Sequence, residues 1–258
     1  METFYVACDL GAEVGRISLG TLDKGRLHVS EIHRFSNEPT QDRDGLQWDI
    51  PQLYQQVISG LTEVGSTDES IHGVSCSSWG HDYMLFDAHG SLLTPARFQS
   101  ARAQASMDEL LAQIPRETIY EETGAQPAPR STFFQLGAEK SRRLAKANQL
   151  LPVADGFNYL LSGQARIEAS MASTTQLFNP IQHTWSDRLL GALRLPSRIL
   201  PPVVPSGSVL GPLRPDIAKQ TRLQDVEVIS SCSYEMASAV SGLPASSDIN
   251  WAFLKPGT

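Results

Sequence analysis

Alternating apolar and polar positions open the chain and predict an antiparallel meander at its N-terminus. One apolar run ends at Asp9, a second alternates after Gly15, and a third alternates over residues 27–35. A period of two is typical of half-buried strands, and the glycines between the first two runs predict a tight hairpin. We therefore expect three consecutive antiparallel strands, with Asp9 at the tip of the first.

Further along, the spacing of apolar residues becomes helical and then mixed. After Pro51, apolar positions recur every three or four residues to Val64, which predicts a helix. Residues 101–151 are mostly helical in spacing, Asp155 is placed to cap another helix, and a further one begins at Met236. Short apolar runs predict strands at residues 71–75, 83–86, 226–230 and 251–254. A meander of strands followed by a mixture of strands and helices indicates an α/β fold with a mixed sheet.

Composition and charge restrict the class of protein. The chain has 258 residues, 41% of them hydrophobic, and a formal net charge of -7, whereas nucleic-acid binders usually present a basic face. No apolar run approaches the roughly 20 residues of a membrane span, and the start lacks the pattern of a signal peptide. Three widely separated cysteines match neither a disulfide framework nor a zinc site. We expect a cytoplasmic protein without a nucleic-acid or membrane partner.

Three short motifs place candidate functional side chains beside turns. The first is Asp9-Leu10-Gly11-Ala12-Glu13-Val14-Gly15-Arg16, whose backbone N–H groups can face an anion while Asp9 holds a metal. The others are Trp79-Gly80-His81-Asp82, ahead of a strand, and Tyr234-Glu235-Met236, at the start of a helix. Each also has a purely structural explanation. The first can be an ordinary hairpin, Asp82 an Asx-turn acceptor and Glu235 a carboxylate that complements a helix N-terminus.

Together, in this order and spacing, the motifs resemble the FGGY family of carbohydrate kinases, and within it most closely the rhamnulokinases. The resemblance implies an α/β fold: an actin-like ATPase domain of RNase H type, with a mixed, partly antiparallel sheet flanked by helices. Residues 1–258 would form the N-terminal sugar-binding domain, and the C-terminal ATP-binding domain of the family is absent from them. We expect these residues to be a fragment of a longer kinase.

The resemblance also implies a reaction and a set of site residues. The reaction is the ATP-dependent phosphorylation of a ketose, with Mg²⁺, in which Glu235 is the catalytic base and Asp9 organises the metal. The residues implied to face ATP are Gly11, Ala12, Glu13, Val14, Gly15, Arg16 and Thr258. Those implied to contact the small-molecule sugar substrate are Trp79, Gly80, His81, Asp82, Arg102, Tyr234 and Met236.

The sequence departs from the family pattern at chemically important positions. Tyr234-Glu235 stands where rhamnulokinases usually carry His-Asp, which lengthens the expected base by one methylene. Glu13-Val14 replaces small hydroxyl residues in the phosphate loop. At residues 98–102 the family often has an Arg-Asp pair before a second arginine, and only Arg102 remains here. Because of these changes, a non-catalytic pseudo-kinase domain that binds a sugar or a protein partner is the alternative hypothesis. On either hypothesis the isolated chain is expected to be inactive as a kinase.

Overall fold

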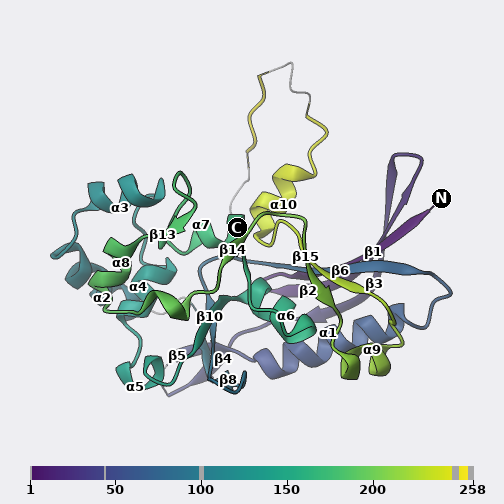
Figure 1. Ribbon diagram of the computed structural model, residues 1–258, viewed down its shortest axis with the longest axis horizontal. Coiled ribbons are helices and arrows are strands. Elements are labelled where there is room, and N and C mark those ends of the chain that lie inside the picture. Colours follow the sequence, from purple (N-terminus) through teal and green to yellow (C-terminus); the bar gives the residue numbers. More distant parts are fainter. Residues whose placement is uncertain (1, 44, 99–101, 246–249, 255–258) are drawn as a thin grey trace.

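The computed structural model describes residues 2–43, 45–98, 102–245 and 250–254, and its centre is a six-stranded mixed sheet (Figure 1). The strand order is β15-β16-β6-β1-β2-β3. The predicted N-terminal meander is confirmed, with β1 (Thr3–Leu10), β2 (Val14–Asp23) and β3 (Arg26–Ser36) pairing antiparallel. Beyond β1, the sheet continues with β6 (Ile71–Ser78) and β16 (Glu227–Ser230), both parallel, and ends at antiparallel β15 (Ser208–Pro212).

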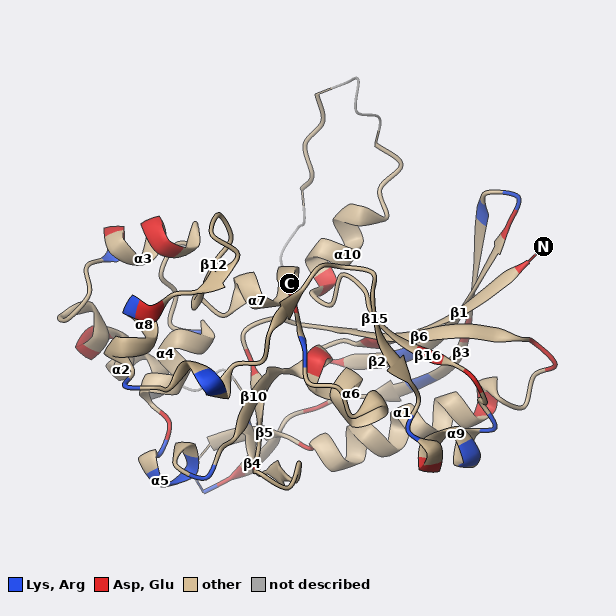
Figure 2. Cartoon of the chain, in the orientation of Figure 1, with Lys and Arg blue, Asp and Glu red and all other residues tan. Residues whose placement is uncertain are grey.

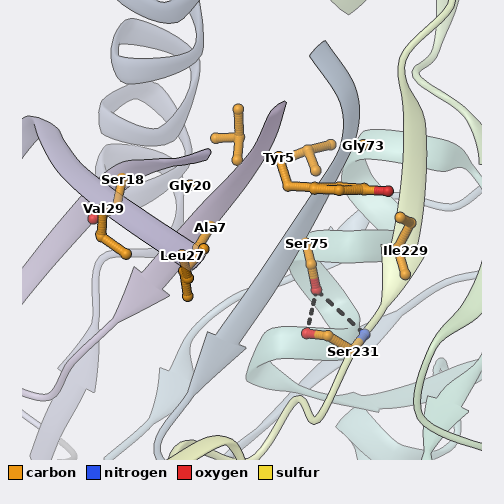
Figure 3. A pocket seen from close by; sticks show the side chains of 12 residues that line it. Tyr5, Ala7, Ser18, Gly20, Leu27, Val29, Gly73, Ser75, Ile229 and Ser231 are labelled. Carbon is orange, nitrogen blue, oxygen red and sulfur yellow. Dashed lines mark hydrogen bonds between the residues drawn. The ribbon is translucent and has the colours of Figure 1, made fainter. Parts of the chain in front are cut away.

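One face of this sheet is buried and the other is largely open. The buried face carries Val6, Cys8 and Ile17, and it is covered by α1 (Ile50–Val64), α6 (Val153–Ser162) and α9 (Pro215–Thr221). On the opposite face, the exposed side chains of Tyr5 and Leu27 line a shallow apolar hollow (Figure 3). Alternation of burial along β1 and β2 therefore follows the alternation of the sequence.

A second region of short strands and helices extends from the sheet (Figure 1). Its strands are β4 (Thr40–Asp42), β5 (Gly45–Trp48), β7 (Tyr83–Phe86), β8 (Leu92–Leu93), β9 (Ala96–Arg97), β10 (Gln149–Pro152), β11 (Ile167–Glu168), β12 (Phe178–Asn179), β13 (Thr184–Trp185) and β14 (Val203–Val204). Its helices are α2 (Arg102–Leu111), α3 (Arg116–Thr123), α4 (Thr132–Gly137), α5 (Ser141–Leu144), α7 (Ala169–Thr174), α8 (Asp187–Ala192) and the 3₁₀ turn η1 (Ser197–Ile199). Helix α10 (Glu235–Ser241) follows β16. Acidic and basic residues intermingle on outer helices such as α8 and α9 (Figure 2).

Three local predictions are wrong. Residues 149–152 form β10 rather than helix, because Leu150 and Leu151 are buried in an antiparallel pair with β7. Residues 251–254 form no strand and are exposed. Asp155 does not cap α6; Pro152 occupies that position, and Asp155 is buried in the first turn. The described helices include none long and apolar enough to cross a membrane.

Candidate functional site

Parallel pairing of β1 and β6 brings the three sequence motifs to one edge of the sheet. Asp9 and Ser77 are register partners at the carboxyl ends of these strands, and the Ser77 hydroxyl donates to Asp9 Oδ1 at 3.5 Å. The next residue, Ser78, donates its N–H to the carbonyl of Ser233 at 2.9 Å and forms an isolated parallel bridge with Tyr234. In open α/β sheets, ligands bind at such carboxyl ends.

The first hairpin is tight and is braced from behind. A Cβ at Gly11 would lie 2.5 Å from the carbonyl oxygen of Val14, so the turn requires glycine there. Buried Asn37 donates its side-chain amide to the Gly11 carbonyl at 2.7 Å and its backbone N–H to the Glu13 carbonyl at 2.9 Å. Asn37 lies between β3 and β4, and no sequence signal marks this bracing role.

The second glycine of the hairpin is explained by packing. A Cβ at Gly15 would lie 2.1 Å from the ring of Phe35, so this glycine makes room for an aromatic side chain of β3. The tip residues Ala12 and Glu13 are exposed, and Val14 is half-buried. Exposed Arg16 lies 3.7 Å from Glu31. The tip of the hairpin thus faces outward, with its fixed contacts on the inner side.

Asp9 and Glu235 place two interacting carboxylates at this edge. Burial raises the pKa of Asp9, the positive charge of Arg16 lowers it, and the negative charge of Glu235 raises it. Mg²⁺ is commonly held by one or two carboxylates together with substrate phosphates, and this pair fits that requirement. In the part of the chain that the structure describes, no group of three His, Cys, Asp or Glu side chains could hold a metal.

His81 is fixed by contacts on both of its ring nitrogens. It has a positive φ of 79°, and its backbone N–H donates to Thr174 Oγ1 at 3.3 Å. Its Nδ1 lies 2.9 Å from the carbonyl oxygen of Thr174, and Arg130 Nε lies 3.3 Å from its Nε2. A carbonyl only accepts, so we assign the proton to Nδ1, and Nε2 then accepts from Arg130. Burial lowers the pKa of His81, the Thr174 contact raises it and Arg130 lowers it, so the neutral ring is favoured.

Asp82 is buried beneath this edge and organises aromatic residues around it. Its Oδ2 accepts from the indole N–H groups of Trp48 at 2.8 Å and Trp79 at 3.0 Å. Its Oδ1 accepts from Gln135 Nε2 at 2.9 Å. The rings of Trp48 and Trp79 are 4.2 Å apart, and both are buried. Gln135 was not predicted as a site residue; it also donates to the carbonyl oxygens of His81 and Arg130 and so joins both to Asp82.

Gly80 allows the second and third motifs to approach closely. A Cβ there would lie 2.9 Å from the side chain of Thr174 and 3.1 Å from the ring of Tyr234. Tyr234, Glu235 and Met236 are half-buried around the start of α10. The backbone of Arg102 begins α2, but its side chain lies outside the described part of the chain, as does the whole of Thr258.

Comparison with known sequences gives a consistent family assignment. Residues 4–242 match the N-terminal domain of the FGGY family of carbohydrate kinases. A rhamnulokinase from Enterococcus faecalis is 36% identical over 257 residues, which cover 98% of this chain and 52% of the relative. A rhamnulokinase from Bacillus subtilis is 34% identical over 256 residues, with the same coverage of both chains. The chain thus spans about half the length of these relatives.

Solved structures confirm the predicted fold class. A gluconate kinase from Lactobacillus acidophilus aligns with a TM-score of 0.81 at 17% identity, over 91% of this chain and 48% of its own. A xylulose kinase from the same organism aligns with a TM-score of 0.81 at 18% identity, over 90% and 48%. The mixed sheet flanked by helices is therefore the actin-like architecture of these sugar kinases.

Proposed function

The chain belongs to the FGGY family of carbohydrate kinases, and from that premise we propose that it is the sugar-binding N-terminal domain of a rhamnulokinase-like enzyme. The enzyme transfers the γ-phosphoryl group of ATP to a hydroxyl of a ketose. Rhamnulose is the first candidate substrate, because the similar sequences are named rhamnulokinases. The observation that supports the proposal most strongly is the convergence of Asp9, Gly80 and Glu235 at one edge of the sheet.

Glu235 serves as the general base in this proposal. It lies in the first turn of α10, is half-buried, and is close enough to Asp9 to raise the pKa of that carboxyl group. Its carboxylate accepts the proton of the sugar hydroxyl as the hydroxyl oxygen bonds to the γ-phosphorus and the bond to the ADP oxygen breaks. Asp9 holds Mg²⁺, which supplies charge neutralisation at the phosphates when bound.

The sugar is bound on the side of Gly80 and His81. Gly80 allows Thr174 and Tyr234 to pack against this edge, and exposed Arg130, whose Nε is held by the ring of His81, offers its remaining N–H groups to sugar hydroxyls. Trp79 and Asp82 are buried, so their contribution is to hold this surface in place from beneath. Tyr234 and Met236 complete the proposed sugar surface, and the backbone of residues 11–16 completes the proposed phosphate side.

A second, nucleotide-binding domain completes the proposed enzyme. The relatives are about twice the length of this chain. The described residues offer carboxylates for Mg²⁺ and a hairpin whose backbone can face the phosphates. We propose that the nucleoside is held by a C-terminal domain, so that ATP lies between the two domains. On this proposal, residues 1–258 alone bind the sugar but do not phosphorylate it.

The function is tested by Glu235→Gln in the complete two-domain kinase. The amide keeps the shape of the side chain but loses the base, so we expect kcat to fall by about a thousandfold while the sugar dissociation constant changes little. Glu117→Gln is the matched control, because Glu117 is an exposed acid in the first turn of α3. Unchanged kcat in Glu235→Gln would remove Glu235 from the mechanism, and sugar binding by an inactive wild type would favour the pseudo-kinase alternative.

A further inference from the structure

A fully buried carboxylate lies beneath the loop that carries the proposed base. Glu168 ends β11, caps α7 and has 0% of its surface exposed. Its Oε2 accepts the backbone N–H of Met171 at 3.1 Å, which is the ordinary N-capping contact. The same oxygen accepts the hydroxyl of Ser170, and Oε1 accepts the hydroxyl of Ser206.

Glu168 also reaches a segment far away in the sequence. Its Oε2 accepts the backbone N–H of Ser233 at 3.1 Å, and Ser170, held by Glu168, receives the backbone N–H of Tyr234 at 3.4 Å. Ser233 and Tyr234 are the two residues immediately before Glu235. A helix cap needs only the Met171 contact, so the contacts to residues 233 and 234 are additional to capping.

Asp155 is also hydrogen-bonded to the side chain of Ser233, and further supports of the loop lie on its other side. Ser231 is hydrogen-bonded to the hydroxyl of Ser75 at 2.6 Å (Figure 3), and the Ser233 carbonyl accepts from Ser78 N at 2.9 Å. These contacts attach residues 231–233 to β6, whereas Glu168 attaches residues 233–234 to α7. The loop is thus held between the strand that leads to Gly80 and the helix that contacts His81.

Among the described residues, Glu168 has only neutral hydrogen-bond donors as partners. A buried carboxylate is costly unless it is hydrogen-bonded, and here two amides and two hydroxyls satisfy it. Behind it, the carboxylate of Asp155 accepts the backbone N–H of Glu168 at 3.3 Å. Burial raises the pKa of Asp155 well above its usual range, the Glu168 amide lowers it and the Glu168 charge raises it, which favours a neutral Asp155 beside Glu168.

We infer that Glu168 is a positioning residue for phosphoryl transfer: by holding Ser233 and Ser170 it sets the place of Glu235 relative to Asp9 and the sugar. This inference rests on the proposed function. It assigns the role to hydrogen-bond acceptance rather than to negative charge. Displacement of a catalytic group by about 1 Å can reduce the rate about a hundredfold. Contacts that fix the position of this loop therefore affect the rate of phosphoryl transfer.

The inference is tested with two substitutions in the active two-domain enzyme. Glu168→Ala removes every acceptor, so we expect kcat to fall about 10- to 100-fold with the sugar KM within about threefold of wild type. Glu168→Gln is the conservative variant. Its amide oxygen can accept from Met171, Ser170 and Ser233, and its NH₂ can donate to Ser206, so we expect kcat within about threefold of wild type.

Glu139→Ala is the matched control for removal of a buried carboxylate. Glu139 is hydrogen-bonded to Tyr83 and Arg143 and has no contact with residues 231–234. We expect it to lower the melting temperature while leaving kcat of the folded enzyme unchanged. If Glu168→Ala does not fold, Ser170→Ala removes the hydroxyl that joins Glu168 to Tyr234 N while leaving the Glu168 contact to Ser233 N in place, and we expect a smaller, several-fold loss of kcat.

Three outcomes overturn the inference. They are an unchanged kcat in folded Glu168→Ala or Ser170→Ala, an equal kcat loss in Glu139→Ala, and no recovery in Glu168→Gln. An inactive wild-type two-domain protein contradicts the proposed function instead, so the two failures are distinguishable.

Discussion

The proposed sugar side and the proposed phosphate side of the site are built differently. On the sugar side, the polar groups of His81 and Asp82 contact Thr174, Arg130, Gln135 and two tryptophans. On the phosphate side, the hairpin is braced on its inner side by Asn37, and its tip at Ala12 and Glu13 is exposed. The sugar side is therefore fixed by contacts within the chain, whereas the phosphate side presents an open turn and two mutually repelling carboxylates.

This difference suggests a division of labour within the proposed enzyme. A surface held by its own hydrogen bonds is already organised for a ligand and loses little freedom when it binds. An exposed hairpin with two carboxylates needs Mg²⁺, phosphates and a second domain to become a complete site. We therefore expect sugar-side substitutions to affect stability strongly and phosphate-side substitutions to affect it little.

The largest contrast is expected between Asp82→Ala and Asp9→Ala. Asp82→Ala leaves two buried indole donors, on Trp48 and Trp79, without their acceptor, and each unsatisfied group costs about 1–3 kcal/mol. We expect the free energy of unfolding to fall by about 4 kcal/mol. Burial disfavours the charged form of Asp9, so Asp9→Ala should change stability by less than about 1 kcal/mol. Urea denaturation measures both, and equal losses would erase the contrast.

A smaller effect on stability, which depends on pH, is expected at His81 on the sugar side. Its pKa is lowered in the folded chain, so its contribution to stability is present above the unfolded pKa, near 6.5, and is lost as the pH falls through the folded value. His81→Asn, which tolerates the positive φ, should flatten the decline in melting temperature below pH 6.5. An unchanged pH profile in that variant would show that another group causes the decline.

The smallest effect is expected at the tip of the hairpin. Glu13 is exposed, so Glu13→Ser should change the free energy of unfolding by less than about 0.5 kcal/mol. Because water and salt screen an exposed charge, we expect the nucleotide affinity of the complete kinase to rise by no more than about twofold. A tenfold gain, measured by calorimetry, would show that the carboxylate points at the phosphates in the bound state.

The sequence was informative where a long periodic pattern determines structure. The meander and α1 follow directly from periods of two and 3.6, because each buries one continuous face. Residues 149–152 were predicted wrongly because a short apolar run fits a helix or a strand equally well, and only the pairing with β7 decides. Residues 251–254 form neither element, because this apolar run is exposed and packs on no face of the sheet.

The site was predictable only in part. Asp9, Gly80 and Glu235 were named from motifs, and the parallel pairing of β1 with β6 explains why distant motifs meet. Asn37, Gln135 and Glu168 were missed because their roles depend on contacts with residues 24 or more positions away: Gly11 and Glu13 for Asn37, His81 and Asp82 for Gln135, and Ser233 for Glu168. Nothing in the local sequence distinguishes them from ordinary polar residues of loops and caps.

The most direct test of the central claim is calorimetric titration of the 258-residue chain with rhamnulose and, separately, with ATP and Mg²⁺. Xylulose and gluconate serve as comparison ligands. Because the sugar side is organised without a second domain, we expect the ketose to bind the isolated chain, and ATP with Mg²⁺ to give no measurable heat of binding. Binding of ATP in the absence of any sugar binding would contradict the account.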